Sequence, residues 1–174
     1  MLVEPLALRA PLAGFNGGLV VEPDMDVLEE HAIEDHLVSP AIRLLEASGL
    51  YVWAYRGNDW YVRDPDGPRV DRESHTLQFE PTVIHDLDAL GPGVAKLVGV
   101  SDDLDAIATA QRSITDELGE HVSAATSQPY YLDVTHPLAN KGAVVAFLSG
   151  LEDISPRDSA RIGDGRNDKV VFER

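Results

Sequence analysis

The stretch Gly163-Asp164-Gly165-Arg166-Asn167-Asp168 carries the strongest signal in the sequence. It is a glycine-rich acidic turn between a short apolar strand and the start of a helix, and ligands of open α/β sheets bind at such carboxyl ends of strands. Glycine lets the backbone turn sharply there. Asp164 offers a hard oxygen ligand suited to magnesium, and Asn167 offers an amide that can reach a phosphate oxygen. The alternative is a plain surface turn, which Asp, Gly and Asn also favour.

A second segment, Asn140-Lys141-Gly142, stands at the start of the helix that carries Val144 and Phe147. A lysine beside a helix N-terminus is a natural partner for a phosphate dianion, because the ammonium and the backbone N–H groups both face it. Lys141 alone would more often be a solvated lysine. Its pairing with the acidic turn, a helix and a strand further on, favours a phosphate site.

Together these segments resemble the haloacid dehalogenase superfamily of phosphohydrolases, in its Cof-type sugar-phosphatase branch with a large α/β cap. Lys141-Gly142 resembles the family's lysine motif, and residues 163 to 168 resemble its acidic metal motif. Asn16-Gly17 resembles the family's hinge-side Asn-Gly. The resemblance spans nearly the whole chain.

The resemblance implies magnesium-dependent hydrolysis of a phosphomonoester through an aspartyl-phosphate, with a small phosphorylated metabolite such as a sugar phosphate as substrate. Lys141 and Asn167 would then act in catalysis, and both would bind the phosphate together with Asn16. Asp164 would be the Mg²⁺ ligand, and Asp168 would belong to the same metal site as support for its loop.

Two motifs of the family are missing ahead of Asn16: the Asp-x-Asp-Gly motif and the Ser/Thr motif that follows it. The family's nucleophilic aspartate lies in an Asp-x-Asp-Gly motif ahead of the Asn-Gly segment, and no such motif precedes Asn16. We therefore expect the chain as given to be incomplete and inactive; the alternative is a non-catalytic fragment or a binding or interaction module derived from such a phosphatase. Asp64-Pro65-Asp66-Gly67 spells the motif, but it falls in the cap region, where Pro65 and Pro68 favour an exposed turn.

The predicted fold is α/β, with a partial Rossmann-like core of the family and an inserted α+β cap domain. Residues 1 to 36 and 137 to 174 form the core remnant, and residues 37 to 136 form the cap, a sandwich of one sheet and two helices. We expect residues 11 to 15 and 161 to 163 to be neighbouring strands of one sheet.

Local patterns predict most of the elements. Strands flank a tight turn at Asn16-Gly17-Gly18, and a helix starts with Ser39 as N-cap and Pro40 as first residue. Ser101 is expected to cap a helix with an apolar side at Leu104, Ile107, Ala108, Gln111 and Ile114. Further strands are expected at 50–55, 60–63, 94–100, 122–127 and 130–134, a short helix or loop at 70–79, a turn at 64–68 and a hairpin tip at 24–26.

Composition excludes several functional classes. The 174 residues carry 14 Lys and Arg against 30 Asp and Glu, a net charge of −16, so we expect no nucleic-acid partner. Zero cysteines exclude disulfides, thiolate metal sites and cysteine nucleophiles. No apolar stretch approaches the ~20 residues of a membrane span, and we expect a cytoplasmic protein. The bare edges of the core remnant are expected either to pair with another copy or to be less ordered than the cap.

Two residue classes carry weaker signals. The six histidines make no zinc pair with a nearby Glu in helical register. An aromatic group on the predicted hairpin could line a sugar site or simply pack against helices, and the sequence leaves both open; its members are Trp53, Tyr55, Trp60 and Tyr61.

Overall fold

The computed structural model describes residues 9–155, 158 and 160. The chain divides into two units, which are described separately: unit 1 comprises Met1–His31 and Leu138–Arg174, and unit 2 comprises Ala32–Pro137. Both units combine strands with helices, so the fold is mixed α/β, as the sequence predicts. Among the helices of the described residues, none is long and apolar enough to cross a membrane.

Unit 2 is built on a six-stranded sheet with the strand order β6-β5-β4-β7-β9-β8. Neighbouring strands are antiparallel except β5 and β6, which are parallel. The strands are β4 (Tyr51–Arg56), β5 (Asp59–Val62), β6 (Thr82–Val83), β7 (Val94–Val100), β8 (Ser123–Gln128) and β9 (Tyr131–Thr135). The predicted hairpin of β4 and β5 and the predicted strands at 94–100, 122–127 and 130–134 are confirmed within a residue or two of their ends.

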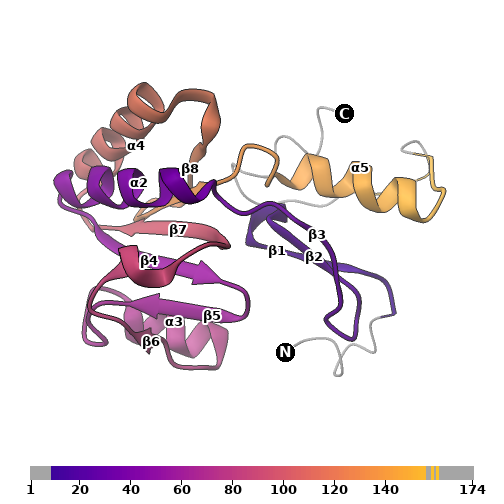
Figure 1. Ribbon diagram of the computed structural model, residues 1–174, viewed down its shortest axis with the longest axis horizontal. Helices are drawn as coiled ribbons and strands as arrows, with labels where there is room; N and C mark the ends of the chain where they lie inside the picture. The colour runs from indigo at the N-terminus through magenta and orange to yellow at the C-terminus, as the bar shows by residue number, and fades with distance from the viewer. Residues whose placement is uncertain (1–8, 156–157, 159, 161–174) are drawn as a thin grey trace. The chain divides into compact units, whose positions relative to one another are not determined.

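Helices cover both faces of this sheet (Figure 1). On one face lie α2 (Asp35–Ala47) and α4 (Leu104–Leu118), whose buried side chains join one apolar core with those of the strands. On the other face lies α3 (Val70–Leu77). Its Glu73 accepts a hydrogen bond from Tyr55 of β4. Tyr55 follows the core residue Ala54, and successive side chains of a strand point to opposite faces of the sheet. Two short 3-10 helices, η2 (Leu87–Leu90) and η3 (Gly119–His121), complete the unit.

The predicted start of α2 at Ser39-Pro40 is wrong. The helix begins at Asp35, and Pro40 lies inside it. Leu37 and Val38 are 8% and 6% exposed, so the first turn buries apolar surface that the predicted start would have left in a loop. This burial outweighs the backbone hydrogen bond that Pro40 cannot donate.

The predicted cap of α4 is also corrected. Asp103, not Ser101, is the N-cap, and its side chain accepts hydrogen bonds from the backbone N–H groups of Asp105 and Ala106 at 2.9 and 3.2 Å. Leu104 was expected on the apolar side but is 57% exposed. The buried positions are Ile107, Ala110, Ile114 and Leu118.

The two ends of unit 2 lie close together on β7. The Ile33 N–H donates to the Val94 carbonyl at 2.8 Å, and Thr135 pairs with Lys96 two residues further along the same strand. A unit whose chain enters and leaves at neighbouring points has the geometry of an inserted domain.

Unit 1 contains a three-stranded antiparallel sheet in the order β1-β2-β3 and the helix α5 (Lys141–Leu151). Its strands are β1 (Leu12–Gly14), β2 (Leu19–Val21) and β3 (Val27–Glu30), and η1 (Phe15–Gly17) joins the first two. The predicted chain reversal at residues 16 to 18 and the hairpin tip at residues 24 to 26 are confirmed, whereas β3 escaped the sequence analysis. Residues 161 to 163 lie outside the described residues, so their pairing with residues 11 to 15 stays a prediction.

Candidate functional site

The N-terminus of α5 presents Lys141 as the first helical residue. Asn140 precedes it in an extended conformation and accepts a hydrogen bond from the Ala143 backbone N–H on its side-chain oxygen, at 2.9 Å. Asn140 is therefore the N-cap of α5, a role that was not predicted from the sequence although Asn is a preferred residue there. The first N–H groups of a helix have no acceptor within it and carry the positive end of the helix dipole. The site therefore combines a lysine charge with a helix start that favours anions.

The turn of Asn16-Gly17 lies directly against this helix start. Gly17 has φ +103°, and a Cβ built on it would lie 2.5 Å from Cγ2 of Val144 and 3.1 Å from the carbonyl oxygen of Asn140. Two segments far apart in the sequence, both singled out by the resemblance, thus meet in unit 1. The structure brings the turn of Asn16 together with the helix of Lys141, while the chemical roles of the two residues stay predictions.

The other predicted site residues are Asp164, Asn167 and Asp168, and all three lie outside the described residues. Within residues 9–155, 158 and 160, no three His, Asp or Glu side chains gather in a way that could hold a metal ion. The assignment of Mg²⁺ to Asp164 and Asp168 therefore rests on the chemistry of their carboxylates and on the resemblance.

The segment Asp64-Pro65-Asp66-Gly67 forms the predicted turn, between β5 and α3. The Gly67 N–H donates to the Asp64 carbonyl at 3.1 Å, and the Asp64 carboxylate accepts from the Asp66 N–H at 2.9 Å. Tyr51 donates its hydroxyl to the same Asp64 carbonyl at 2.8 Å. The Asp64 side chain thus stabilises its own turn.

The aromatic group of the β4–β5 hairpin is packed inside unit 2. Trp53 and Trp60 are both 0% exposed and meet edge to face, with ring centroids 5.3 Å apart. Tyr55 stacks on Trp60 beneath α3, where burial, and then the charge of Glu73, raises the pKa of its hydroxyl. Of the two interpretations that the sequence leaves open, the packing role fits these buried rings.

An ion pair with a buried carboxylate lies on the same face of the sheet and was not predicted from the sequence. The ammonium of Lys96 on β7 lies 3.5 Å from the carboxylate of Asp133 on β9, and their side chains are 19% and 4% exposed. Ser127 donates a hydrogen bond to Asp133 at 3.0 Å, and Lys96 also lies over the ring of Tyr55. A single lysine within the apolar run Val94 to Val100 is the signal that could have predicted a partner.

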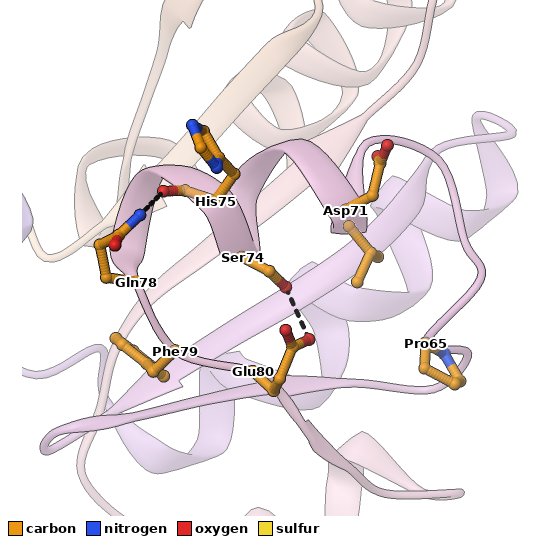
Figure 2. A pocket seen from close by; sticks show the side chains of 8 residues that line it. Pro65, Asp71, Ser74, His75, Gln78, Phe79 and Glu80 are labelled. Carbon is orange, nitrogen blue, oxygen red and sulfur yellow. Dashed lines mark hydrogen bonds between the residues drawn. The ribbon is translucent and has the colours of Figure 1, made fainter.

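A pocket of about 610 Å³ opens beside α3 (Figure 2). Ser74 lies at its centre and donates a hydrogen bond to Glu80 at 3.0 Å. Its lining is Pro65, Val70, Asp71, Ser74, His75, Gln78, Phe79 and Glu80. The lining contains none of the predicted site residues. Among the described residues, the acidic groups of the pocket form no cluster that could hold a metal ion.

Comparisons with known proteins give one family match and two curated relatives. The family model described as haloacid dehalogenase-like hydrolase matches residues 1–174. Curated relatives from Haemophilus influenzae and Buchnera aphidicola, whose names propose phosphatase activity, are each 24% identical over 93% and 97% of this chain. The chain spans only 61% and 62% of their lengths.

Solved structures show the same fold. The crystal structure of a haloacid dehalogenase-like hydrolase from Bacteroides thetaiotaomicron superposes with a TM-score of 0.83 at 19% identity, covering 95% of this chain and 65% of the other. A haloacid dehalogenase-like hydrolase from B. subtilis also gives a TM-score of 0.83, at 17% identity, covering 98% of this chain and 68% of the other.

Proposed function

Because this chain belongs to the haloacid dehalogenase-like hydrolases, we propose that the protein is a magnesium-dependent phosphatase acting on a small phosphorylated metabolite such as a sugar phosphate. The observation that carries the proposal is the start of α5. There Lys141 is the first helical residue, behind the N-cap Asn140 and against the turn of Gly17. A phosphate dianion is a ligand that an ammonium and the N–H groups at a helix N-terminus bind well together.

The remaining roles are those of Asp164, Asn167 and Asp168. Carboxylate oxygens are the ligands that Mg²⁺ prefers, so Asp164, supported by Asp168, would hold the ion. Bound there, the ion would neutralise charge on the phosphate. The amide of Asn167 would donate a hydrogen bond to a phosphate oxygen, and the amide of Asn16 would do the same. Unit 2 is proposed as the cap that selects the leaving group. A cytoplasmic location, the absence of nucleic-acid and membrane partners, and self-association stay proposals.

Phosphate binding tests the site directly. Inorganic phosphate is titrated with Mg²⁺ into the 174-residue chain while the backbone amide signals of residues 141 to 143 are followed by NMR. Lys141→Met is expected to raise the phosphate Kd at least about tenfold, since hydrogen bonds to charged groups contribute about 1.5–3 kcal/mol. Arg112→Met removes one positive charge from the exposed side of α4 and serves as the matched control. Equal affinities in the Lys141 and Arg112 variants would contradict the proposed site.

Turnover is a separate question, because residues 1 to 15 contain no aspartate. We predict at most trace hydrolysis of a generic phosphate ester with Mg²⁺, since Lys141, Asn167 and Asp164 can bind phosphate without supplying a nucleophile. Robust turnover that disappears on Asp64→Asn would assign the nucleophile to the turn of Asp64. Turnover that survives Asp64→Asn but fails on Asp164→Asn would require a different mechanism. Phosphate binding without turnover is the result expected both of a phosphatase chain without its nucleophile and of a binding module, so the binding experiment and not turnover tests the site.

A further inference from the structure

Two features of the structure, its backbone conformation and its close neighbours, exclude a side chain at Gly17. Its φ of +103° lies in a region that residues other than glycine rarely adopt. A Cβ there would also lie 2.5 Å from Cγ2 of Val144, well inside the ~3.5–4.0 Å at which carbon atoms make favourable contact. Gly14, in the same hairpin, differs in both respects, because its φ is −116° and nothing lies within 4 Å of its Cβ position.

The two atoms that Gly17 approaches belong to the first turn of α5, on either side of Lys141. Asn140 supplies the N-cap, and its carbonyl accepts the Val144 N–H at 3.2 Å, which closes that turn. Val144 supplies the methyl group that lies against the Gly17 backbone. The first turn of α5 therefore packs against the backbone of Gly17.

The turn that presents Gly17 is strained and firmly held. Phe15 and Asn16 both have positive φ, 52° and 60°, which for a bulky residue such as Phe15 is a true outlier. Strained backbone of this kind persists only where surrounding structure imposes it, and it is common at functional sites. Here the β1–β2 pairing, the Gly18 N–H to Phe15 carbonyl bond of 3.0 Å and the His31 N–H to Gly18 carbonyl bond of 2.7 Å impose it.

We propose that Gly17 is a positioning residue for Lys141: its bare backbone fixes the first turn of α5, and with it the direction of the ammonium and of the N–H groups that receive phosphate. The proposal rests on the proposed function for the identity of the ligand. A side chain at position 17 would displace the helix start, because the hairpin behind the turn leaves less freedom to yield than the end of a helix does.

Size complementation tests this contact in the full chain. We compare Gly17→Ala, Val144→Ala, the double variant and the control Gly14→Ala. Two quantities are measured: the Kd for inorganic phosphate with Mg²⁺, and hydrogen exchange of the Ala143 amide, which Asn140 caps. Gly17→Ala is expected to raise Kd about tenfold and to speed Ala143 exchange several-fold. Gly14→Ala is expected to change neither. The double variant should recover part of both losses, because the closest clash is gone while the unfavourable φ remains.

The outcomes separate the positioning role from the function and from general instability. Exchange in unit 2 serves as the reference for correct folding. If Gly17→Ala binds phosphate as wild type does while Lys141→Met does not, the positioning role is wrong and the phosphate site stands. If wild type binds no phosphate, the proposed function fails, and unchanged Ala143 exchange in Gly17→Ala then overturns the contact as well. Should Gly17→Ala not fold, Val144→Ala alone decides, because loss of its methyl contact is expected to weaken phosphate binding several-fold and unchanged binding contradicts the proposal.

Discussion

At the residue scale, Asn140 combines a structural task with a place beside the proposed ligand. One substitution of Asn140 removes its capping oxygen, and another keeps a capping oxygen but adds a negative charge. Asn140→Ala should cost about 1 kcal/mol of local stability, seen as roughly fivefold faster hydrogen exchange of the α5 amides. Asn140→Asp keeps a capping oxygen and should leave exchange unchanged, but its carboxylate should weaken phosphate binding by repulsion. Equal phosphate affinity in wild type and Asn140→Asp would contradict a phosphate site at this helix start.

Tyr131 gives a residue-scale prediction about alkaline pH. Burial, and then the negative charge of Glu73, raises the pKa of its hydroxyl from 10.0 to about 12. The folded protein therefore keeps a proton that the unfolded chain loses, so this contribution to stability is complete below pH 10.0 and is lost as pH rises to about 12. Denaturant unfolding at stepped pH should show stability falling across that window, with a shallower fall in Tyr131→Phe. Parallel pH profiles for the two proteins would contradict the shift.

Single residues also show where sequence reasoning stops. The hairpin turn at Asn16-Gly17 is readable because glycine and asparagine favour left-handed backbone, a local property. The approach of Gly17 to Val144 is not readable, because it depends on how two distant segments pack. Ser101 and Asp103 are both good caps, and only the position of the buried stripe of α4 decides for Asp103.

At the scale of elements, the strands β7 and β9 are tied by the ion pair of Lys96 and Asp133. Removing one partner leaves a buried charge, so Lys96→Met is expected to destabilise unit 2 by about 3 kcal/mol. The double change Lys96→Met with Asp133→Leu replaces the pair by apolar groups of similar size and should recover most of that loss. Denaturant unfolding followed by tryptophan fluorescence measures both. If the double variant is no more stable than Lys96→Met, the loss comes from the missing attraction between Lys96 and Asp133 and not from the buried carboxylate that Lys96→Met leaves behind.

Elements with strong local patterns were predicted and those fixed by tertiary burial were not. The strand 94–100 and the hairpin of β4 and β5 follow from apolar runs and a glycine turn, and both are confirmed. The start of α2 was misplaced because Ser39-Pro40 is a good local start signal, while burial of the preceding turn extends the helix. The face that α3 covers is set by contacts between distant segments, such as the hydrogen bond from Tyr55 on β4 to Glu73 on α3, which no periodicity encodes.

At the scale of the whole molecule, the family was recognisable because its site segments have fixed spacings in the sequence, with Lys141 at 23 positions ahead of Asp164. The mixed α/β fold follows from the same order of elements. The grouping of Ala32–Pro137 into one unit depends on contacts that a sequence does not display: Ile33 bonded to β7, and β9 paired beside the same point. A segment with adjoining ends and its own apolar core can fold without the rest of the chain.

We therefore predict that a fragment of residues 32–137 folds alone and cooperatively. Both tryptophans of the chain, Trp53 and Trp60, lie in its interior, so their fluorescence reports this unit in the fragment and in the full chain alike. The fragment should unfold at nearly the same urea concentration as the unit does in the full chain. In calorimetry its thermal unfolding should show the heat-capacity change of about 1.2–1.5 kcal/mol/K that is typical of a domain of about 100 residues. A fragment of residues 50–137 lacks α2, which supplies Ile42 and Leu45 to the core, and should not fold. A non-cooperative transition in the fragment of residues 32–137 would mean that unit 2 needs the remainder of the protein to fold.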